Sequence, residues 1–404
     1  MARRDTNGVV MFVEYIWMLD GWPEFQFKSE SLLTPVSQAR FTQGEFLALM
    51  RSVGIDARLE SELEATVDDV LKTSAIEGEM LNPASVRSSI ARRLGIPDHG
   101  VTPKDTKVEG VVDIVMDAVK NHATPLTAER IYGWHAALFP TGYSGLHKID
   151  VGQWRTDAEG PMQVVSNHSN PRKRRVHYEA PPAERLDDEM TRFLRWFNGQ
   201  STRLDPILRA GIAHLWYVSI HPLDDGNGRT ARAIADLAVA QAEKTGQRFY
   251  SMSSQIERDK DDYYATLEAT QKGDLDITDW LEWFVGCYAR AIKTAHATAE
   301  RVVNRARFWQ THAARPFNDR QTKALTRLLD DFKDPMTSQK WSSMCHCSKE
   351  TAIRDIADLA ERGILLRNEG SGKRTSYRLN WPPEEEADLT AEPEGEDQDA
   401  APAP

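Results

Sequence analysis

The sequence predicts a mainly α-helical protein that carries two small β-hairpins. Three observations favour this fold class. Apolar residues recur at helical spacing through most of the first 310 residues, which is typical of helices with one buried face. Short β-like runs occur only at about 161–180 and at the end of a unit at 319–381. In that unit three helical segments precede two strands, which is the pattern of a winged helix-turn-helix.

The expected helices set the boundaries of the domains. They lie at 35–54, 57–76, 82–98, 107–121, 126–139, 183–198 and about 286–309. Gly78 and Gly95 each follow a helical segment, where glycine commonly ends the last turn. The chain then divides into an N-terminal helical region at 1–105, a core at 106–310, a winged helix at 319–381 and an acidic, proline-rich tail at 382–404. The tail cannot bury an apolar core, so we expect it to be disordered.

Composition narrows the class of protein. The formal net charge is −11, but the tail carries most of that charge and no basic residue, so the rest of the chain is close to neutral. No apolar run approaches the roughly 18 residues of a membrane span, and the N-terminus lacks a secretory apolar segment. Three cysteines imply no disulfide framework, and Cys345-His346-Cys347 lacks the spacing of a zinc site. A cytoplasmic protein without membrane contact is the expectation.

The stretch 221–232 lies between two apolar segments with helical spacing and reads His-Pro-Leu-Asp-Asp-Gly-Asn-Gly-Arg-Thr-Ala-Arg. Pro222 and the run Gly226, Asn227 and Gly228 break that spacing, which predicts a helix, a tight loop and a second helix. The loop therefore brings backbone N–H groups to the start of a helix, where they favour a bound anion. Glycines on both sides of Asn227 remove the Cβ atoms that would keep a phosphate at a distance.

Four side chains of this stretch complete a predicted nucleotide-phosphate site. Arg229 and Arg232 lie three residues apart on one helix face, so that together they can grip one polyphosphate. Asp225 offers a hard oxygen ligand to Mg²⁺, which usually takes one or two carboxylates together with phosphate oxygens. His221 changes its charge near neutral pH and is the natural proton acceptor. Each residue alone has a structural alternative, such as a helix cap or a solvated ion pair, but their combination predicts a general base beside bound phosphates.

The same stretch resembles the signature of the Fic (Fic/Doc) family, H-P-F-x-[D/E]-G-N-G-R-x-x-R, with Leu223 at the position of the phenylalanine. The resemblance implies a Fic-type helical bundle and a protein adenylyltransferase, which transfers AMP from ATP, with Mg²⁺, to a Tyr, Thr or Ser hydroxyl of a protein. In that reaction His221 takes the hydroxyl proton and Asp225 holds the metal. The motif leaves open the use of another nucleotide or of phosphocholine, the removal of AMP, and modification of the chain by itself.

A second motif, at 73–78, precedes the core. Thr73-x-x-x-Glu77-Gly78 resembles the inhibitory [S/T]-x-x-x-E-[G/N] element of Fic proteins. The resemblance implies that Glu77 pairs with Arg232 and occupies the space of the γ-phosphate, because an arginine that holds a carboxylate cannot also orient ATP. Taken alone, Glu77 is a solvated acid near a helix C-terminus, where the helix dipole disfavours an anion.

A hairpin flap is expected at about 161–180, preceded by Arg155, which we interpret as a structural residue. The resemblance implies that the flap lies over the nucleotide, near Val165 and Ser166, and aligns a target segment by strand addition. The turn at 167–174 is then either a solvated loop tip or a contact for an acidic target.

The resemblance also implies that Tyr263, Tyr264 and Gln271 line the adenine and ribose pocket, whereas the apolar pattern alone places both tyrosines in the core. The predicted winged helix has two uses to consider. Its third helix would enter the major groove of DNA, but Asp355 and Asp358 are among the acids that weaken its electrostatic footprint. We therefore expect it to serve protein docking or a homodimer, and the alternative is a nucleotide-sensing, DNA-binding transcriptional regulator.

Overall fold

The structure is a computed structural model that describes residues 2–4, 10–12, 14–97, 105–166, 175–329, 335–368 and 375–381. It divides into two compact units, Met1–His296 and Ala297–Pro404, and the division falls within the long helix α11 (Thr278–Thr311). The first unit includes the predicted N-terminal region at 1–105 together with most of the predicted core at 106–310. In the described ranges, no helix combines the length and apolarity that a membrane span requires.

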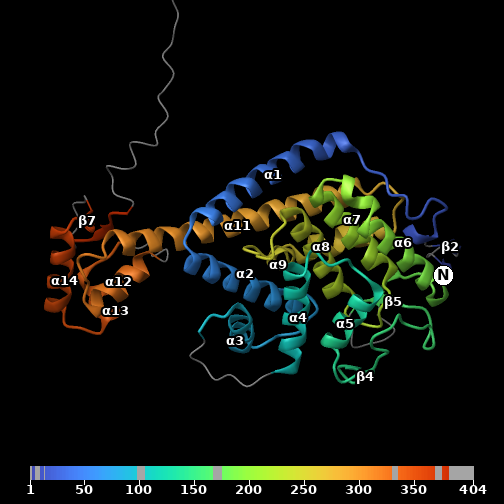
Figure 1. Ribbon diagram of the computed structural model, residues 1–404, viewed down its shortest axis with the longest axis horizontal. Helices are drawn as coiled ribbons and strands as arrows, with labels where there is room; N and C mark the ends of the chain where they lie inside the picture. Colours follow the sequence, from blue (N-terminus) through green and yellow to red (C-terminus); the bar gives the residue numbers. More distant parts are fainter. Residues whose placement is uncertain are drawn as a thin grey trace, which may run out of the picture. The chain divides into compact units, whose positions relative to one another are not determined.

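The first unit is a bundle of helices around α7 (Pro206–Ile220) and α8 (Asn227–Glu243) (Figure 1). Nearly every residue of α7 is buried, because a helix that is apolar on all sides is stable only when other helices enclose it. The start of α11 packs on α7, where Trp280 Nε1 donates to Gly211 O at 2.8 Å. The other α-helices of the unit are α1 (Ser29–Ser52), α2 (Ile55–Ile76), α3 (Pro83–Leu94), α4 (Thr106–Lys120), α5 (Ala128–Leu138), α6 (Leu186–Asn198), α9 (Met252–Arg258) and α10 (Lys260–Gln271).

Two helices begin at least six residues earlier than the sequence predicted. The helix predicted at 35–54 begins at Ser29, and it carries Pro35 in its second turn, where the ring removes one backbone hydrogen bond without ending the helix. The helix predicted at about 286–309 begins at Thr278. Its first turn is stabilised by Asp276, whose Oδ1 accepts a hydrogen bond from Thr278 N at 3.0 Å. No side chain caps the start of α1, so such a contact explains the difference at Thr278 but not the one at Ser29.

The first unit has short antiparallel hairpins in addition to its helices. The predicted flap is present as β5 (Gln163–Val165) paired with β6 (Val176–Glu179), with an irregular register between Val164 and Val165. The turn predicted at 167–174 lies outside the described residues. Two further pairs were not predicted, namely β1 (Ala2–Arg4) with β2 (Val10–Phe12) and β3 (Tyr143–Ser144) with β4 (His147–Lys148). The flap is fixed to α7, because Tyr178 Oη donates a hydrogen bond to Ser219 O at 2.7 Å.

The second unit shows the predicted order of three helices and a hairpin. These are α12 (Asp319–Leu329), α13 (Ser338–Cys345), α14 (Lys349–Glu361), β7 (Leu365–Arg367) and β8 (Tyr377–Leu379). They enclose a separate core that includes Phe308, Leu325, Trp341, Ile356 and Leu365. The assignment of this unit as a winged helix stays a prediction. The wing turn at 370–374 and the acidic tail at 382–404 lie outside the described residues.

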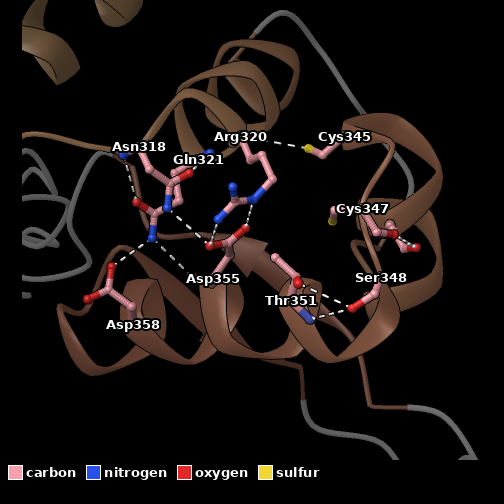
Figure 2. Close-up of polar contacts among 10 residues, drawn as sticks. Asn318, Arg320, Gln321, Cys345, Cys347, Ser348, Thr351, Asp355 and Asp358 are labelled. Atoms are coloured by element: carbon pink, nitrogen blue, oxygen red, sulfur yellow. Dashed lines mark hydrogen bonds and ion pairs between the residues drawn. The ribbon is translucent and has the colours of Figure 1, made fainter.

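Acidic residues of α14 face α12 rather than solvent alone (Figure 2). Arg320 Nε donates to Asp355 Oδ2 at 2.8 Å, and Gln321 Nε2 donates to Asp358 Oδ2 at 2.7 Å. The charge of Asp355 is offset by Arg320, and that of Asp358 by Arg362, whose Nη1 lies 3.4 Å from Oδ2, so both acids contribute less to the electrostatic footprint of α14 than the sequence suggested. Cys345 Sγ contacts Arg320 O at 3.4 Å, and among the described side chains no group of three or more His, Cys, Asp or Glu residues is arranged to hold a metal ion.

Candidate nucleotide-binding and catalytic site

The stretch 221–232 folds as the predicted helix, loop and helix. α7 ends at Ile220 and is followed by His221, which has a positive φ of 53°, and α8 starts after Gly226, which has a φ of 82°. Arg155 holds the start of the loop through two hydrogen bonds. Its Nε donates to His221 O at 2.8 Å, and its backbone N–H donates to Pro222 O at 2.9 Å. Arg155 is buried, so these contacts support the structural role expected for it.

The imidazole of His221 has a defined tautomer. Nδ1 lies 3.1 Å from Val218 O, and because a carbonyl oxygen can only accept, Nδ1 carries the proton and Nε2 keeps its lone pair. Burial lowers the pKa of His221 to about 4, which leaves the ring neutral at pH 7. The hydrogen bond and the lowered pKa therefore leave His221 with an unprotonated Nε2, which a general base requires before reaction.

The residues of the glycine loop have different tasks. Asn227 Oδ1 accepts from Leu223 N at 3.0 Å and its Nδ2 donates to Leu223 O at 2.7 Å, so the amide holds the shape of the loop. A Cβ at Gly226 would lie 2.9 Å from Leu138 Cδ1, and its φ is positive, so this glycine is required by packing and conformation. Only at Gly228 would a Cβ overlap an anion, the Glu77 carboxylate. Gly228 is therefore the position that allows close approach.

The predicted ion pair between the motif at 73–78 and α8 is present. Arg232 Nη2 donates to Glu77 Oε1 at 2.7 Å, and Arg232 is buried. Thr73 contributes two contacts to the same guanidinium, since its Oγ1 accepts from Nε at 2.7 Å and its backbone oxygen accepts from Nη2 at 2.9 Å. Gly78, with a φ of 82°, ends α2 as expected and turns the chain just after Glu77. The inhibitory role of this contact stays a prediction.

A second carboxylate from the same turn, not anticipated from the sequence, holds the other arginine. Arg229 Nη1 donates to Glu79 Oε2 at 2.7 Å, and its guanidinium carbon lies 5.2 Å from the ring centroid of Phe139. Thus both arginines of the motif are paired with acids that lie two residues apart. The sequence did contain a signal for this second ion pair. An acid lies on each side of Gly78, and these two acids equal the two arginines of α8 in number and are opposite to them in charge.

Asp225 is the residue predicted to hold a magnesium ion, and that role stays a prediction. Its Oδ1 accepts from Gly226 N at 2.6 Å, and its Oδ2 accepts from the hydroxyl of Ser144. Among the described side chains no group of three or more His, Cys, Asp or Glu residues is arranged as a closed metal cage, so Asp225 offers a carboxylate beside a neutral hydroxyl. That donor set suits Mg²⁺, which completes its octahedron with phosphate oxygens and water.

The predicted nucleotide-pocket residues differ in how much surface they offer. Tyr263 is 2% exposed, with its Oη 3.0 Å from His214 Nε2, and Gln271 is 4% exposed and donates to Ser219 Oγ at 3.1 Å. Tyr263 thus lies in the core, as the apolar pattern alone favoured, and Gln271 is buried as well. Tyr264, which the same pattern also placed in the core, is 41% exposed, so for this residue that expectation is wrong.

The flap offers its own surface. Val165 is 41% exposed at the end of β5. Ser166 closes the described part of the hairpin, since its N–H donates to Arg175 O at 2.9 Å and its Oγ accepts from Arg175 N at 2.8 Å. Among the predicted pocket residues, Val165 and Tyr264 therefore have the most surface available for a ligand.

Two protein-family models match parts of this sequence. Residues 125–239, which hold α5, the flap, α7 and most of α8, match the model described as the Fic/DOC family. The chain contains a Fic/DOC family domain. Residues 15–96 match a second model, described as a domain of unknown function (DUF4172). The turn with Glu77 and Glu79 thus lies outside the match to the Fic domain and inside this second one.

Known proteins are similar to the chain at low identity. Protein adenylyltransferase Fic from Nematostella vectensis is 24% identical over 276 residues, which cover 67% of this chain and 55% of that protein. The chain thus spans about half the length of that relative. A uridine 5'-monophosphate transferase from Xanthomonas campestris pv. campestris (strain 8004) is 31% identical over 121 residues, or 28% of this chain and 21% of that protein.

A solved structure shares the fold. The crystal structure of a Fic family protein from Desulfovibrio desulfuricans G20 matches with a TM-score of 0.52 at 18% identity, and covers 88% of this chain and 98% of that one. The predicted Fic-type helical bundle with small hairpins is therefore confirmed. At this identity the likeness concerns the fold alone.

Proposed function

We propose that this chain is a protein adenylyltransferase, which transfers AMP from ATP to a hydroxyl side chain of a protein. The observation that carries the proposal is the carboxylate at the N-terminus of α8. Glu77 lies against Gly228 and Arg232, on the kind of helix N-terminus that binds phosphate. A neutral imidazole, His221, belongs to the same helix–loop–helix. The name of the Nematostella relative supports AMP as the transferred group.

In the proposed reaction the hydroxyl oxygen of the target attacks the α-phosphorus of ATP. A new O–P bond forms, the bond from the α-phosphorus to the oxygen that bridges to the β-phosphate breaks, and pyrophosphate leaves with the electron pair. His221 Nε2 takes the hydroxyl proton. Backbone N–H groups at the start of α8, together with Arg229 and Arg232, stabilise the negative charge on the phosphate oxygens. Asp225 would hold Mg²⁺, which when bound neutralises charge on the phosphates.

The proposal includes restraint of the site by the turn after α2. Glu77 holds Arg232 and Glu79 holds Arg229, so both guanidinium groups assigned to the outer phosphates already have a carboxylate partner. ATP must displace these carboxylates, because Glu77 fills the space against Gly228 and a carboxylate beside either guanidinium repels a second anion there. We therefore expect the wild-type chain to be weakly active until another event moves this turn.

Labelled nucleotides test the proposed function directly. The Glu77→Gly chain is incubated with a cell lysate and ATP that carries ³²P either at the α- or at the γ-phosphate. AMP transfer predicts protein labelling from the α-position alone, because the γ-phosphate leaves with pyrophosphate. α-Labelled UTP serves as the parallel substrate, since one relative is a uridine 5'-monophosphate transferase. γ-Label above that of the same lysate without the chain, or no added label from α-labelled ATP or UTP, would contradict nucleotidyl transfer.

The pH dependence of transfer should reflect the lowered pKa of His221. A base with a pKa of about 4 stays unprotonated down to mildly acidic pH, so the rate should be level between about pH 8 and 6 and should fall only as pH approaches 4. An unperturbed histidine would instead lose half of its base form at about pH 6.5. Initial rates of the Glu77→Gly chain across this range, with circular dichroism at each pH as a control for unfolding, distinguish the two profiles.

A further inference from the structure

The short hairpin β3–β4 places a hydroxyl against the proposed metal ligand. Ser144 Oγ donates a hydrogen bond to Asp225 Oδ2, while the Gly226 backbone N–H donates to the other oxygen, Oδ1, at 2.6 Å. Ser144 and Asp225 lie 81 residues apart in the sequence. Ser144 belongs neither to the Fic signature nor to the inhibitory motif, and the reaction described above gives it no task.

The hairpin is fixed to the motif loop by contacts that do not involve the Ser144 side chain. The Asp150 backbone N–H donates to Asp224 Oδ2 at 2.7 Å, next to the residue that Ser144 binds. The base of the hairpin is closed by Ile149 N–H, which donates to Gly142 O at 3.0 Å. The position of the hydroxyl is therefore set by the backbone of its own hairpin.

Other polar groups near Asp225 are engaged elsewhere or form no hydrogen bond. The Arg229 guanidinium donates to Glu79, and the ring nitrogens of the buried His135 have no hydrogen-bond partner among the described residues. Within the part of the chain that the structure describes, the hydrogen bond from Ser144 is thus the side-chain contact that fixes the rotation of the Asp225 carboxylate.

We propose that Ser144 is a positioning residue, which orients the Asp225 carboxylate for the Mg²⁺ of a magnesium–nucleotide complex. This inference rests on the function proposed above. Mg²⁺ demands near-ideal octahedral geometry and takes few carboxylates, so the orientation of a single carboxylate decides whether its oxygen meets the metal. A hydroxyl suits this task, because it donates a hydrogen bond without adding a positive charge that would repel the cation.

Calorimetry with a non-transferable nucleotide, α,β-methylene-ATP, tests this role in the full-length Glu77→Gly chain. Ser144→Ala should raise the Mg²⁺ concentration for half-maximal nucleotide binding by about 10- to 100-fold, the effect of losing one hydrogen bond to a charged group. Affinity for the analogue in EDTA should not change. Ser144→Thr keeps the hydroxyl and should restore the lower Mg²⁺ requirement. Thr141→Ala, which removes an exposed hydroxyl just before the hairpin, is the matched control.

The outcomes separate a positioning role from a merely structural one. An unchanged Mg²⁺ requirement in Ser144→Ala overturns the proposal, and so does a threonine variant that behaves like the alanine variant. Weaker binding of the analogue in EDTA by Ser144→Ala would indicate a damaged pocket and would also overturn it. Because the readout is binding, it is independent of transfer: a chain that labels no protein but shows the Mg²⁺ shift refutes the proposed function and retains the role of Ser144.

Discussion

Replacing Glu77 with glycine should increase the rate of AMP transfer by about 10- to 100-fold at limiting ATP. The substitution removes the carboxylate that Arg232 holds at 2.7 Å and clears the space against Gly228. A charge-assisted hydrogen bond contributes about 1.5–3 kcal/mol, which corresponds to about 10- to 100-fold in affinity for a competing anion. Initial rates with α-labelled ATP, together with ATP affinity from calorimetry, measure the effect.

Two conservative variants act as controls for this increase. Glu77→Gln keeps the size of the side chain and removes its charge, so it should activate nearly as well as glycine if the carboxylate charge is what competes with phosphate. Glu77→Asp keeps the charge on a shorter stem and should give an intermediate rate. Equal activity of Glu77→Gly and the wild type would exclude inhibition by this residue.

Glu79 should restrain the site more weakly than Glu77. Its side chain is 41% exposed, compared with 30% for Glu77, and exposed ion pairs contribute little to binding. Glu79→Gln alone should therefore raise activity only a few-fold. Added to Glu77→Gly, it should lower the KM for ATP further, because Arg229 is then also released. A double variant with the same KM as Glu77→Gly would show that the pair with Arg229 has no restraining effect.

The sequence predicted contacts whose two partners both belong to recognisable motifs. The pair of Glu77 and Arg232 is of this kind, because each residue has a fixed place in a signature. Helix positions in the core were predicted for a related reason, since the 3.6-residue spacing of apolar side chains reports a buried face. The same spacing, taken without the resemblance, favoured the buried environment in which Tyr263 lies.

The contacts that the sequence did not predict join common residue types across long separations. Ser144 reaches Asp225 over 81 residues, and Glu79 reaches Arg229 over 150. A serine in a short hairpin and a glutamate after a helix are ordinary residues, so neither composition nor periodicity marks them. Their partners are set by how β3–β4 and the end of α2 pack beside α8, which is a property of the tertiary structure.

Replacing His221 with alanine should reduce AMP transfer by about 10²- to 10⁴-fold while ATP affinity stays within a few-fold of the parent chain. The range is that of a lost general base. Nucleotide binding depends on groups that the substitution leaves in place, namely the start of α8, Arg229 and Arg232. Both properties are measured in the Glu77→Gly background, so that the carboxylate of Glu77 does not obscure the affinity.

The backbone at His221 requires a second variant. Its φ of 53° lies in the left-handed region, where alanine is strained by roughly 1–2 kcal/mol and asparagine is better tolerated. His221→Asn should therefore preserve the loop and still lack a base, so it should match the alanine variant in transfer and equal the parent chain in thermal stability. If either variant kept most of its transfer activity, the imidazole of His221 would not be the base of the transfer reaction.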